Sequence, residues 1–450
     1  MPTREHWSSR LGFIFAAVGS AVGLGVLWLF PYTVGENGGC LFLITYMACI
    51  VLIGIPVLIG ELLMGRSSQR AAVGAFGRLA EHRPFWKLGG WFGVLSSFVI
   101  MSFYSVIAGY GMSYILMSLT NSFEGLSPAQ VNQAYDSLST SGDIAIFWHF
   151  IFTAITMGIV FGGVRKGIEY WATIMTRALL VILVVLFFYS IRLSGFAQAA
   201  EFIFAPNWGE FNWGSVLEAL GLAFFTLSLG QGIMISYGSY MKDKESIPRV
   251  ALIVSLAVIV VATLVAMTIF PVVFTFGYSP QEGPGLIFKT LPYLFAQLPG
   301  SLIVSTTFFV LFVFTALTSS IPFIEVVATN LMELLGWKRR KAVLLTAVGT
   351  FLFGTPSALS RTDVMKSWDV IYGKDFLSTM NGLVSAWLIP IGGLITAVFM
   401  GWVLDKSVIC DQFHTKRAGS VGFELWRFGM RWVIPVLIFL IIVQKSGVWT

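Results

Sequence analysis

RLGFIFAAVGSAVGLGVLWLFPYTVGENGG, residues 10–39, is the stretch of sequence that decides the fold. It is apolar enough to enter a membrane, yet Gly19, Gly23 and Gly25 lie within seven residues and Pro31 follows. Glycine weakens a helix by about 1 kcal/mol relative to alanine. Because lipid offers no hydrogen-bond partner, broken backbone at membrane depth is tolerated only where it lines a cavity, and there it can hold a ligand. The stretch therefore predicts either a helix broken near the bilayer midplane or a glycine-rich face against a close helix neighbour.

The composition is typical of a membrane protein with many spans. Of the 450 residues, 56% are hydrophobic and 11% are charged, and the mean hydropathy is +0.83. A soluble domain has about 25% charged residues. The net charge of +6 requires no nucleic-acid partner, because cytoplasmic loops of membrane proteins collect Lys and Arg. The three cysteines and four histidines lack metal-site spacing, and no catalytic triad or phosphate loop is found, so we expect no enzyme.

Apolar segments of about 20 residues, the length that spans a bilayer, recur along the chain. We expect eleven spans, near residues 11–33, 40–64, 89–118, 144–163, 168–193, 214–240, 248–275, 300–335, 341–356, 376–403 and 426–444.

The charges of the loops orient these spans. Lys and Arg gather in the loops after spans two, four, six, eight and ten, whereas the loop at about 119–143 has neither. The positive-inside rule then predicts a multi-pass protein of the cell's inner (plasma) membrane, with its N-terminus in the cytoplasm and, after eleven spans, its C-terminus outside.

A second glycine-interrupted stretch, Ser228–Gly232, lies in span six, five spans after the first. Because five is odd, the chain divides into two five-helix repeats of opposite orientation, residues 1–195 and 196–405, followed by a loop and span eleven at 406–450. A pair of interrupted helices in corresponding positions of two halves indicates a transporter's binding site. The pairing therefore favours broken helices over a packing face.

Broken helices offer N–H groups at one end and C=O groups at the other, which suit a carboxylate and an ammonium or sodium ion. A zwitterionic amino acid matches both at once. Span eight adds the run Thr315–Ser320, whose hydroxyls and carbonyls are hard oxygen donors suited to Na⁺, although such side chains also commonly bond within their own helix.

Three ionisable residues fall within the predicted spans. For Glu61 we expect an anchor that accepts hydrogen bonds from broken span one, with a direct functional role as the alternative. Arg177 either snorkels or pairs, and its partner is not evident from the sequence. For His149 we expect a hydrogen-bonded packing role.

With these features the chain resembles the neurotransmitter:sodium symporter family, specifically its bacterial amino-acid members with eleven spans. The resemblance covers nearly the whole chain. Its most specific motifs, in order, are W-x-S-R-L-G-F at Trp7–Phe13, A-V-G-L-G at Ala21–Gly25, F-P-Y with E-N-G-G at Phe30–Gly39, G-I-P with E-x-x-x-G-R at Gly54–Arg66, A-F-F-T-L-S-L-G at Ala223–Gly230, G-P-G-L-I-F-x-T-L-P at Gly283–Pro292 and A-L-T-S-S-I at Ala316–Ile321.

The resemblance implies an all-α integral membrane fold, the LeuT-like inverted 5+5 repeat plus one helix, with spans one and six broken at the midplane. The substrate would lie between spans one, three, six and eight, its carboxylate near the Gly25 N–H and the Tyr104 hydroxyl. Gly23 replaces the acidic residue of monoamine transporters, which favours an amino acid with its own carboxylate. The implied substrate residues are Ser20, Ala21, Leu24, Gly25, Ile100, Tyr104, Phe225, Thr226, Ser228, Gln231, Ser319 and Phe323.

The resemblance also implies ion sites and gates. One Na⁺ would bind the carbonyls of Gly19, Val22 and Thr315 and the hydroxyls of Thr318 and Ser319. Ala21 and Thr226 are the remnant of another Na⁺ site. A cytoplasmic gate would pair Arg4 with Glu333 beside Trp7, and Asp375 is the candidate aspartate of the outer gate.

Several positions depart from the family pattern. Val26 and Val258 replace side-chain ligands of the other Na⁺ site. Leu29 replaces the outer-gate arginine, and Leu222 replaces the glutamine that supports that arginine. Arg177 replaces a proline of span five.

The sequence therefore predicts a sodium-coupled symporter of neutral, hydrophobic amino acids that works by alternating access. The alternative is a coupling-deficient or non-transporting relative that acts as an amino-acid-binding scaffold or sensor. The expected partners are a free amino acid and the lipid bilayer, and the sequence specifies no oligomeric state.

Overall fold

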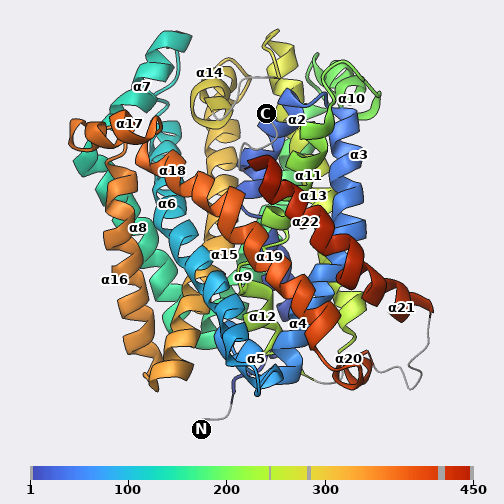
Figure 1. Ribbon diagram of the computed structural model, residues 1–450. Helices are drawn as coiled ribbons and strands as arrows, with labels where there is room; N and C mark the ends of the chain where they lie inside the picture. The colour runs from blue at the N-terminus through green and yellow to red at the C-terminus, as the bar shows by residue number, and fades with distance from the viewer. Residues whose placement is uncertain (1–3, 243–244, 281–284, 414–420, 446–450) are drawn as a thin grey trace.

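The computed structural model describes residues 4–242, 245–280, 285–413 and 421–445, and these form a bundle of long helices (Figure 1). No strand occurs in these ranges, apart from an isolated bridge between Gly39 and Pro206. Figure 1 shows α5 and α20 at one end of the bundle and α7, α10 and α17 at the other.

The first five expected spans are present, with kinks at π-helical segments labelled η. They are α1 (Arg10–Ala21), η1 (Gly25–Leu29) and α2 (Phe30–Glu36) for span one; α3 (Cys40–Cys49), η2 (Ile50–Gly54) and α4 (Ile55–Ser68) for span two; α6 (Lys87–Leu119) for span three; α8 (Gly142–Phe161) for span four; and η4 (Val164–Glu169) and α9 (Tyr170–Ser190) for span five.

The later spans follow in the same way. They are α11 (Trp213–Thr226) and α12 (Ile233–Gly238) for span six; α13 (Ile247–Thr275) for span seven; α15 (Ser301–Leu335) for span eight; α16 (Arg339–Ala358) for span nine; α18 (Phe376–Leu383), η8 (Val384–Leu388), α19 (Ile389–Val398) and η9 (Phe399–Val403) for span ten; and α21 (Val421–Phe428), η10 (Gly429–Val433) and α22 (Ile434–Lys445) for span eleven.

Short helices connect the spans. They are α5 (Ala72–Leu79), η3 (Pro84–Trp86), α7 (Pro128–Thr140), α10 (Phe196–Phe204), η6 (Leu286–Thr290), α14 (Leu291–Ala296), η7 (Asp363–Met365), α17 (Lys366–Tyr372) and α20 (Lys406–Gln412).

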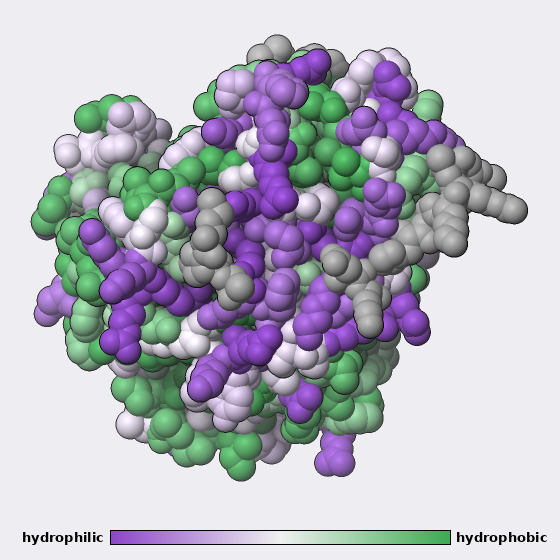
Figure 2. Space-filling view, turned by 90° about the horizontal axis from the view of Figure 1, so that it is seen from below, coloured by the Kyte–Doolittle hydropathy of each residue, from purple (hydrophilic) through white to green (hydrophobic). Residues whose placement is uncertain are grey.

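Nine helices in the described ranges are long and apolar enough to cross a membrane, and the bent pair of span one makes ten. The eleventh expected span, near 214–240, is divided into α11 and α12, each too short to cross alone. Seen from the α5 end, hydrophilic residues gather over the middle of the face and hydrophobic residues lie at its periphery (Figure 2).

The centre of the bundle is closely packed around α1, α6 and α15. On α6, successive turns are small or hydroxylated, and Ser102, Ser105, Ala108 and Gly109 are all buried. Small residues let neighbouring helix backbones approach closely. The two broken spans therefore lie inside the protein rather than against lipid.

Candidate substrate and sodium site

The first break consists of Val22, Gly23 and Leu24, and the helix axes on its two sides differ by 45°. The Val22 N–H still bonds the Val18 carbonyl at 2.7 Å, but the Val26 N–H bonds the Gly23 carbonyl at 2.9 Å. The Val22 carbonyl therefore lacks its usual helical partner. The last carbonyls of α1 and the first N–H groups of η1 open into the break.

The second break runs from Leu227 to Gly232 between α11 and α12. Gly230 and Gly232 have φ values of 72° and 71°, a region that only glycine adopts at low cost, and Ser228 adopts φ 55°. Strained backbone of this kind clusters at functional sites. Gly230 and Gly232 thus explain why the chain leaves the helix here.

Two serines connect the broken spans to span eight. Ser228 Oγ donates to the Ser20 carbonyl at 3.2 Å, and Ser319 Oγ lies 2.9 Å from the same carbonyl and 3.2 Å from that of Gly19. The three segments are thus joined at the last turn of α1.

A small cavity of about 10 Å³ lies at this junction. It is lined by Ser20, Ala21, Gly23, Leu24, Gly25, Tyr104, Phe225, Thr226, Ser228, Gln231, Ser319 and Phe323. Eleven of the twelve expected substrate residues are therefore brought together, and Gly23 joins them. Ile100 is fully buried one turn before Tyr104 on α6, outside the lining set.

Tyr104 and Gly23 shape the polar side of the cavity. The Tyr104 hydroxyl accepts the Leu24 N–H at 3.2 Å and would lie 3.3 Å from a Cβ on Gly23. The same Cβ would lie 2.4 Å from Ser319 Oγ. The space beside the break therefore depends on glycine, and the Tyr104 hydroxyl lies at its edge.

The rest of the lining is apolar apart from one amide. Phe323 packs edge-on against the Tyr104 ring with centroids 5.5 Å apart, and Phe225 is shared with a hollow of about 230 Å³ on the other side. Phe225 therefore separates the cavity from that hollow. Gln231 is 1% exposed, and its backbone carbonyl accepts Ser97 Oγ at 2.7 Å.

The oxygens expected to bind one Na⁺ also come together. Thr318 Oγ1 is 3.0 Å from the Thr315 carbonyl, and Ser319 Oγ contacts the Gly19 carbonyl. A Cβ on Gly19 would lie 3.0 Å from the Thr318 Cβ, so α1 and α15 touch at this level. Carbonyl and hydroxyl oxygens of this kind fit a hard monovalent cation.

The other expected sodium position is filled by apolar side chains. Val26 and Val258 are fully buried, and neither has an oxygen on its side chain. The Thr226 hydroxyl donates to the Leu222 carbonyl at 2.9 Å and accepts the Tyr46 hydroxyl at 2.8 Å. Both hydrogen-bonding functions of Thr226 are therefore used within the protein.

Glu61 anchors a broken span, but not the one we expected. Its Oε1 accepts the N–H of Gly230 at 2.7 Å, in the break of span six, and the expectation of bonds from span one is wrong. The physical reason is proximity, because α4 packs closely against α12. The fully buried Glu61 Oε2 has no hydrogen-bond partner among the described residues.

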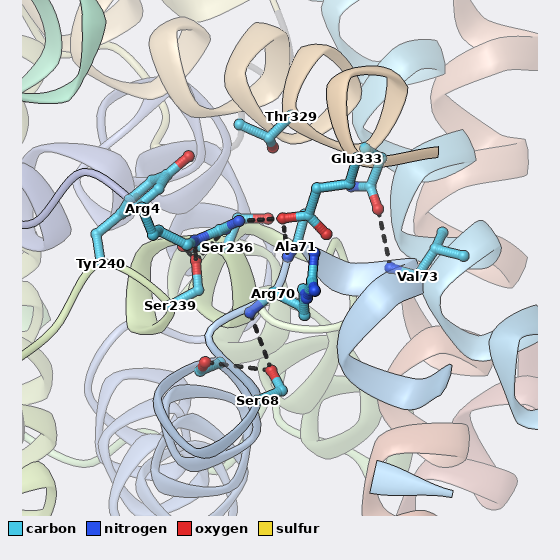
Figure 3. A network of polar contacts seen from close by, with 12 residues as sticks. Arg4, Ser68, Arg70, Ala71, Val73, Ser236, Ser239, Tyr240, Thr329 and Glu333 are labelled. Carbon is cyan, nitrogen blue, oxygen red and sulfur yellow. Dashed lines mark hydrogen bonds and ion pairs between the residues drawn. The ribbon is translucent and has the colours of Figure 1, made fainter. Parts of the chain in front are cut away.

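Arg4 and Glu333 form an ion pair below the cavity, as expected for a cytoplasmic gate (Figure 3). Glu333 also accepts the Ala71 N–H at 2.9 Å, and the Arg4 guanidinium lies 4.8 Å from the Tyr240 ring centroid. Trp7 Nε1 donates to the Tyr237 carbonyl at 3.0 Å. The segment before α1 is thus held against spans six and eight.

A second group of ionic contacts near the Arg4–Glu333 pair was not predicted from the sequence. The Tyr240 hydroxyl donates to Glu325 at 2.6 Å, and Arg339 pairs with the same fully buried carboxylate at 2.5 Å. The signal was present, since an acidic residue within span eight marks a functional candidate by depth alone.

On the opposite side the expected outer gate is incomplete. Asp375 caps α18 by accepting the Ser378 N–H at 2.6 Å, and together with Leu29 it lines a hollow of about 390 Å³. Leu29 and Leu222 line the adjoining hollow, and neither can form an ion pair.

The remaining intramembrane residues have defined environments. His149 has a partner on each ring nitrogen, Ser105 Oγ at 2.8 Å and the Phe351 carbonyl at 3.0 Å, so its packing role is confirmed. The Arg177 guanidinium stacks 4.8 Å from the Phe15 ring centroid.

Comparison with known proteins agrees with this geometry. The profile of the sodium:neurotransmitter symporter family matches residues 4–135 and 128–448. The chain belongs to this family. The sodium-dependent transporter YhdH of Bacillus subtilis is 36% identical over 447 residues, covering 98% of both chains. A sodium-dependent transporter of Haemophilus influenzae is 31% identical over 454 residues, again covering 98% of both.

A solved structure gives the same result for the fold. The crystal structure of MhsT in complex with L-phenylalanine has a TM-score of 0.91 and 37% identity, covering 98% of this chain and 100% of MhsT. The chain is therefore a multi-pass sodium-dependent transporter of LeuT-like fold, and not an enzyme. The family and fold predictions are confirmed, whereas the division at residues 195 and 405 stays a prediction.

Proposed function

We propose that this symporter carries a neutral, hydrophobic amino acid by alternating access, coupled to one Na⁺. The observation that carries the proposal is the cavity at the two breaks, where backbone ends, the Tyr104 hydroxyl and the gap at Gly23 surround a mainly apolar space. A carboxylate and an ammonium fit the two kinds of backbone end. The L-phenylalanine bound by the related MhsT supports an amino acid of this class.

The proposed stoichiometry of one Na⁺ rests on the difference in oxygen ligands between the two expected sodium positions. The oxygens around Thr318 and Ser319 can surround a cation, whereas Val26 and Val258 offer none from their side chains. Stripping water from Na⁺ without replacing its ligands is very costly. The proposal therefore assigns Na⁺ to the position between α1 and α15 alone.

The conformational state supports alternating access. The Arg4–Glu333 pair and the Glu325 layer close the α5 end, whereas hollows lined by Leu29 reach Phe225 from the opposite end. We assign the closed end to the cytoplasm, because Lys and Arg concentrate in the loops on that side. The start of α1 is then cytoplasmic and the end of α22 is external.

The test is uptake of labelled amino acids into proteoliposomes, with Na⁺ replaced by K⁺ in a parallel set. We expect uptake of a hydrophobic amino acid that requires Na⁺, with a Hill coefficient of about one. Equal uptake in K⁺ would refute sodium coupling. Binding without uptake would instead favour the non-transporting alternative, which the missing ion pair at Leu29 motivates.

A further inference from the structure

Arg177 is a cation at a depth where charges are rare. It lies on α9, thirteen residues before the helix ends, in the otherwise uncharged sequence YWATIMTRALLVILVVLFFYS. A charged side chain inside a span is costly and by default indicates function. Arginine stays protonated under all physiological conditions. No carboxylate lies within ion-pair distance of it in the part of the chain that the structure describes, and its contact is the ring of Phe15.

Thr176, the residue before Arg177, shows how close this turn of α9 lies to the oxygens proposed to bind Na⁺. Thr176 Oγ1 donates to the Phe15 carbonyl at 3.1 Å and would lie 2.4 Å from a Cβ on Gly19. The Thr318 Cβ would lie 3.0 Å from that same Cβ. Thr176 and Thr318 therefore flank Gly19 from two sides.

The position of the guanidinium follows from these contacts. Phe15 is one helical turn before Gly19, a rise of about 6 Å. With the guanidinium 4.8 Å from the Phe15 centroid, its charge lies on the order of 10 Å from the proposed Na⁺, toward the closed gate. The Arg177 side chain is exposed on the outer face of α9, in the middle of a span, whereas Thr176 beside it is buried toward α1. Within a span the surroundings hold no salt solution, so screening by salt is weak.

We propose that Arg177 is a fixed cation that weakens Na⁺ binding at the Gly19–Thr318 position and so promotes release of the ion toward the α5 end. This inference rests on the proposed function. A unit charge at about 10 Å, at an effective dielectric constant of about 20, changes the dissociation constant of a monovalent cation about tenfold. The stacking on Phe15 holds the charge beside α1 without neutralising it.

The experiment is a Na⁺ titration of the purified full-length transporter by thermal shift, repeated for uptake in proteoliposomes. Arg177→Gln should lower the half-saturating Na⁺ concentration about tenfold and slow maximal uptake, because release becomes harder. Arg177→Lys keeps the charge and should behave as the parent. Arg177→Met is a second neutral variant, better suited to an apolar surface in case the glutamine variant folds poorly.

Arg192→Gln is the matched control, since it removes the same charge fifteen residues further along, beyond the end of α9. It should leave the Na⁺ titration unchanged. A sodium-dependent parent whose Na⁺ affinity is the same in Arg177→Gln, Arg177→Met and Arg192→Gln would overturn the inference. So would an effect of Arg177→Gln that appears only in anionic lipid, because the guanidinium would then act on a headgroup. A parent with no Na⁺ dependence would instead refute the proposed function.

Discussion

Replacing Ser319 with alanine tests the assignment of the sodium position. Ser319 Oγ bonds the Ser20 carbonyl at 2.9 Å and the Gly19 carbonyl at 3.2 Å, so it lies beside two of the oxygens at the end of α1. With Na⁺ bound, this hydroxyl would turn its lone pairs to the ion. Loss of a hydrogen-bonding group to a charged partner costs about 1.5–3 kcal/mol. The half-saturating Na⁺ concentration should therefore rise about ten- to a hundredfold.

Ser320 is the matched control for this substitution. It is equally buried, but its hydroxyl contacts Thr156 at 2.9 Å and the Leu317 carbonyl at 3.0 Å, on the side of α15 that faces span four. Ser320→Ala should cost about 1 kcal/mol of stability and leave the Na⁺ titration unchanged.

The assay is thermal stabilisation by Na⁺ without amino acid, because a ligand that binds the folded state raises its melting temperature by mass action. Uptake kinetics then show whether the reduced Na⁺ affinity also slows transport. If Ser319→Ala and Ser320→Ala gave the same Na⁺ affinity as the parent, Na⁺ would not bind between α1 and α15.

Four further substitutions test other parts of the site. Gly23→Ala should abolish amino-acid binding in a folded protein, measured with labelled ligand, because the added methyl would lie 2.4 Å from Ser319 Oγ; retained affinity would show that the substrate does not use this gap. Gln231→Leu should favour leucine over tyrosine in competition assays, because the buried amide can no longer form a hydrogen bond with a polar substrate side chain. An unchanged preference would place the substrate elsewhere in the cavity. Val26→Asn should cost about 1–3 kcal/mol and leave the Hill coefficient at about one, because its amide enters a packed apolar position; a coefficient near two would contradict the single-ion proposal. Glu333→Gln should increase hydrogen exchange in the segment before α1, because it removes the ion pair with the N-terminal arginine; unchanged exchange would mean that the pair does not hold the gate.

Span prediction from the sequence was accurate because lipid imposes a simple rule. Twenty apolar residues with internal backbone bonds are required, and segments such as 248–275 and 300–335 meet it almost residue for residue. Span five was placed too late, since η4 begins at Val164, where Gly163 at φ 79° ends the preceding turn. The short connecting helices were not predicted, because they lie outside the apolar segments that the rule detects.

The binding residues were predicted as a set through the glycine breaks and ordered motifs, and the structure brings eleven of the twelve to one cavity. Hydrogen-bond partners were harder to predict from the sequence. Glu61 was assigned to the wrong broken span, and the Tyr240–Glu325–Arg339 layer was missed. Each of these contacts joins residues from different spans, and composition or periodicity within one segment carries no information about which helices are neighbours.

The sequence by itself determined that the chain crosses a membrane many times and that spans one and six are interrupted, because hydropathy and glycine act locally on the backbone. It also places Val26, which has no side-chain oxygen, at a position where the family resemblance implies a sodium ligand. Only the tertiary structure decided that Ser228 and Ser319 meet the end of α1, that Phe225 divides the cavity from the outer hollow, and that Arg177 stacks on Phe15, one turn before Gly19. These depend on the packing of helices far apart in the chain, which brings groups to within hydrogen-bond or Coulomb range only once the bundle is assembled.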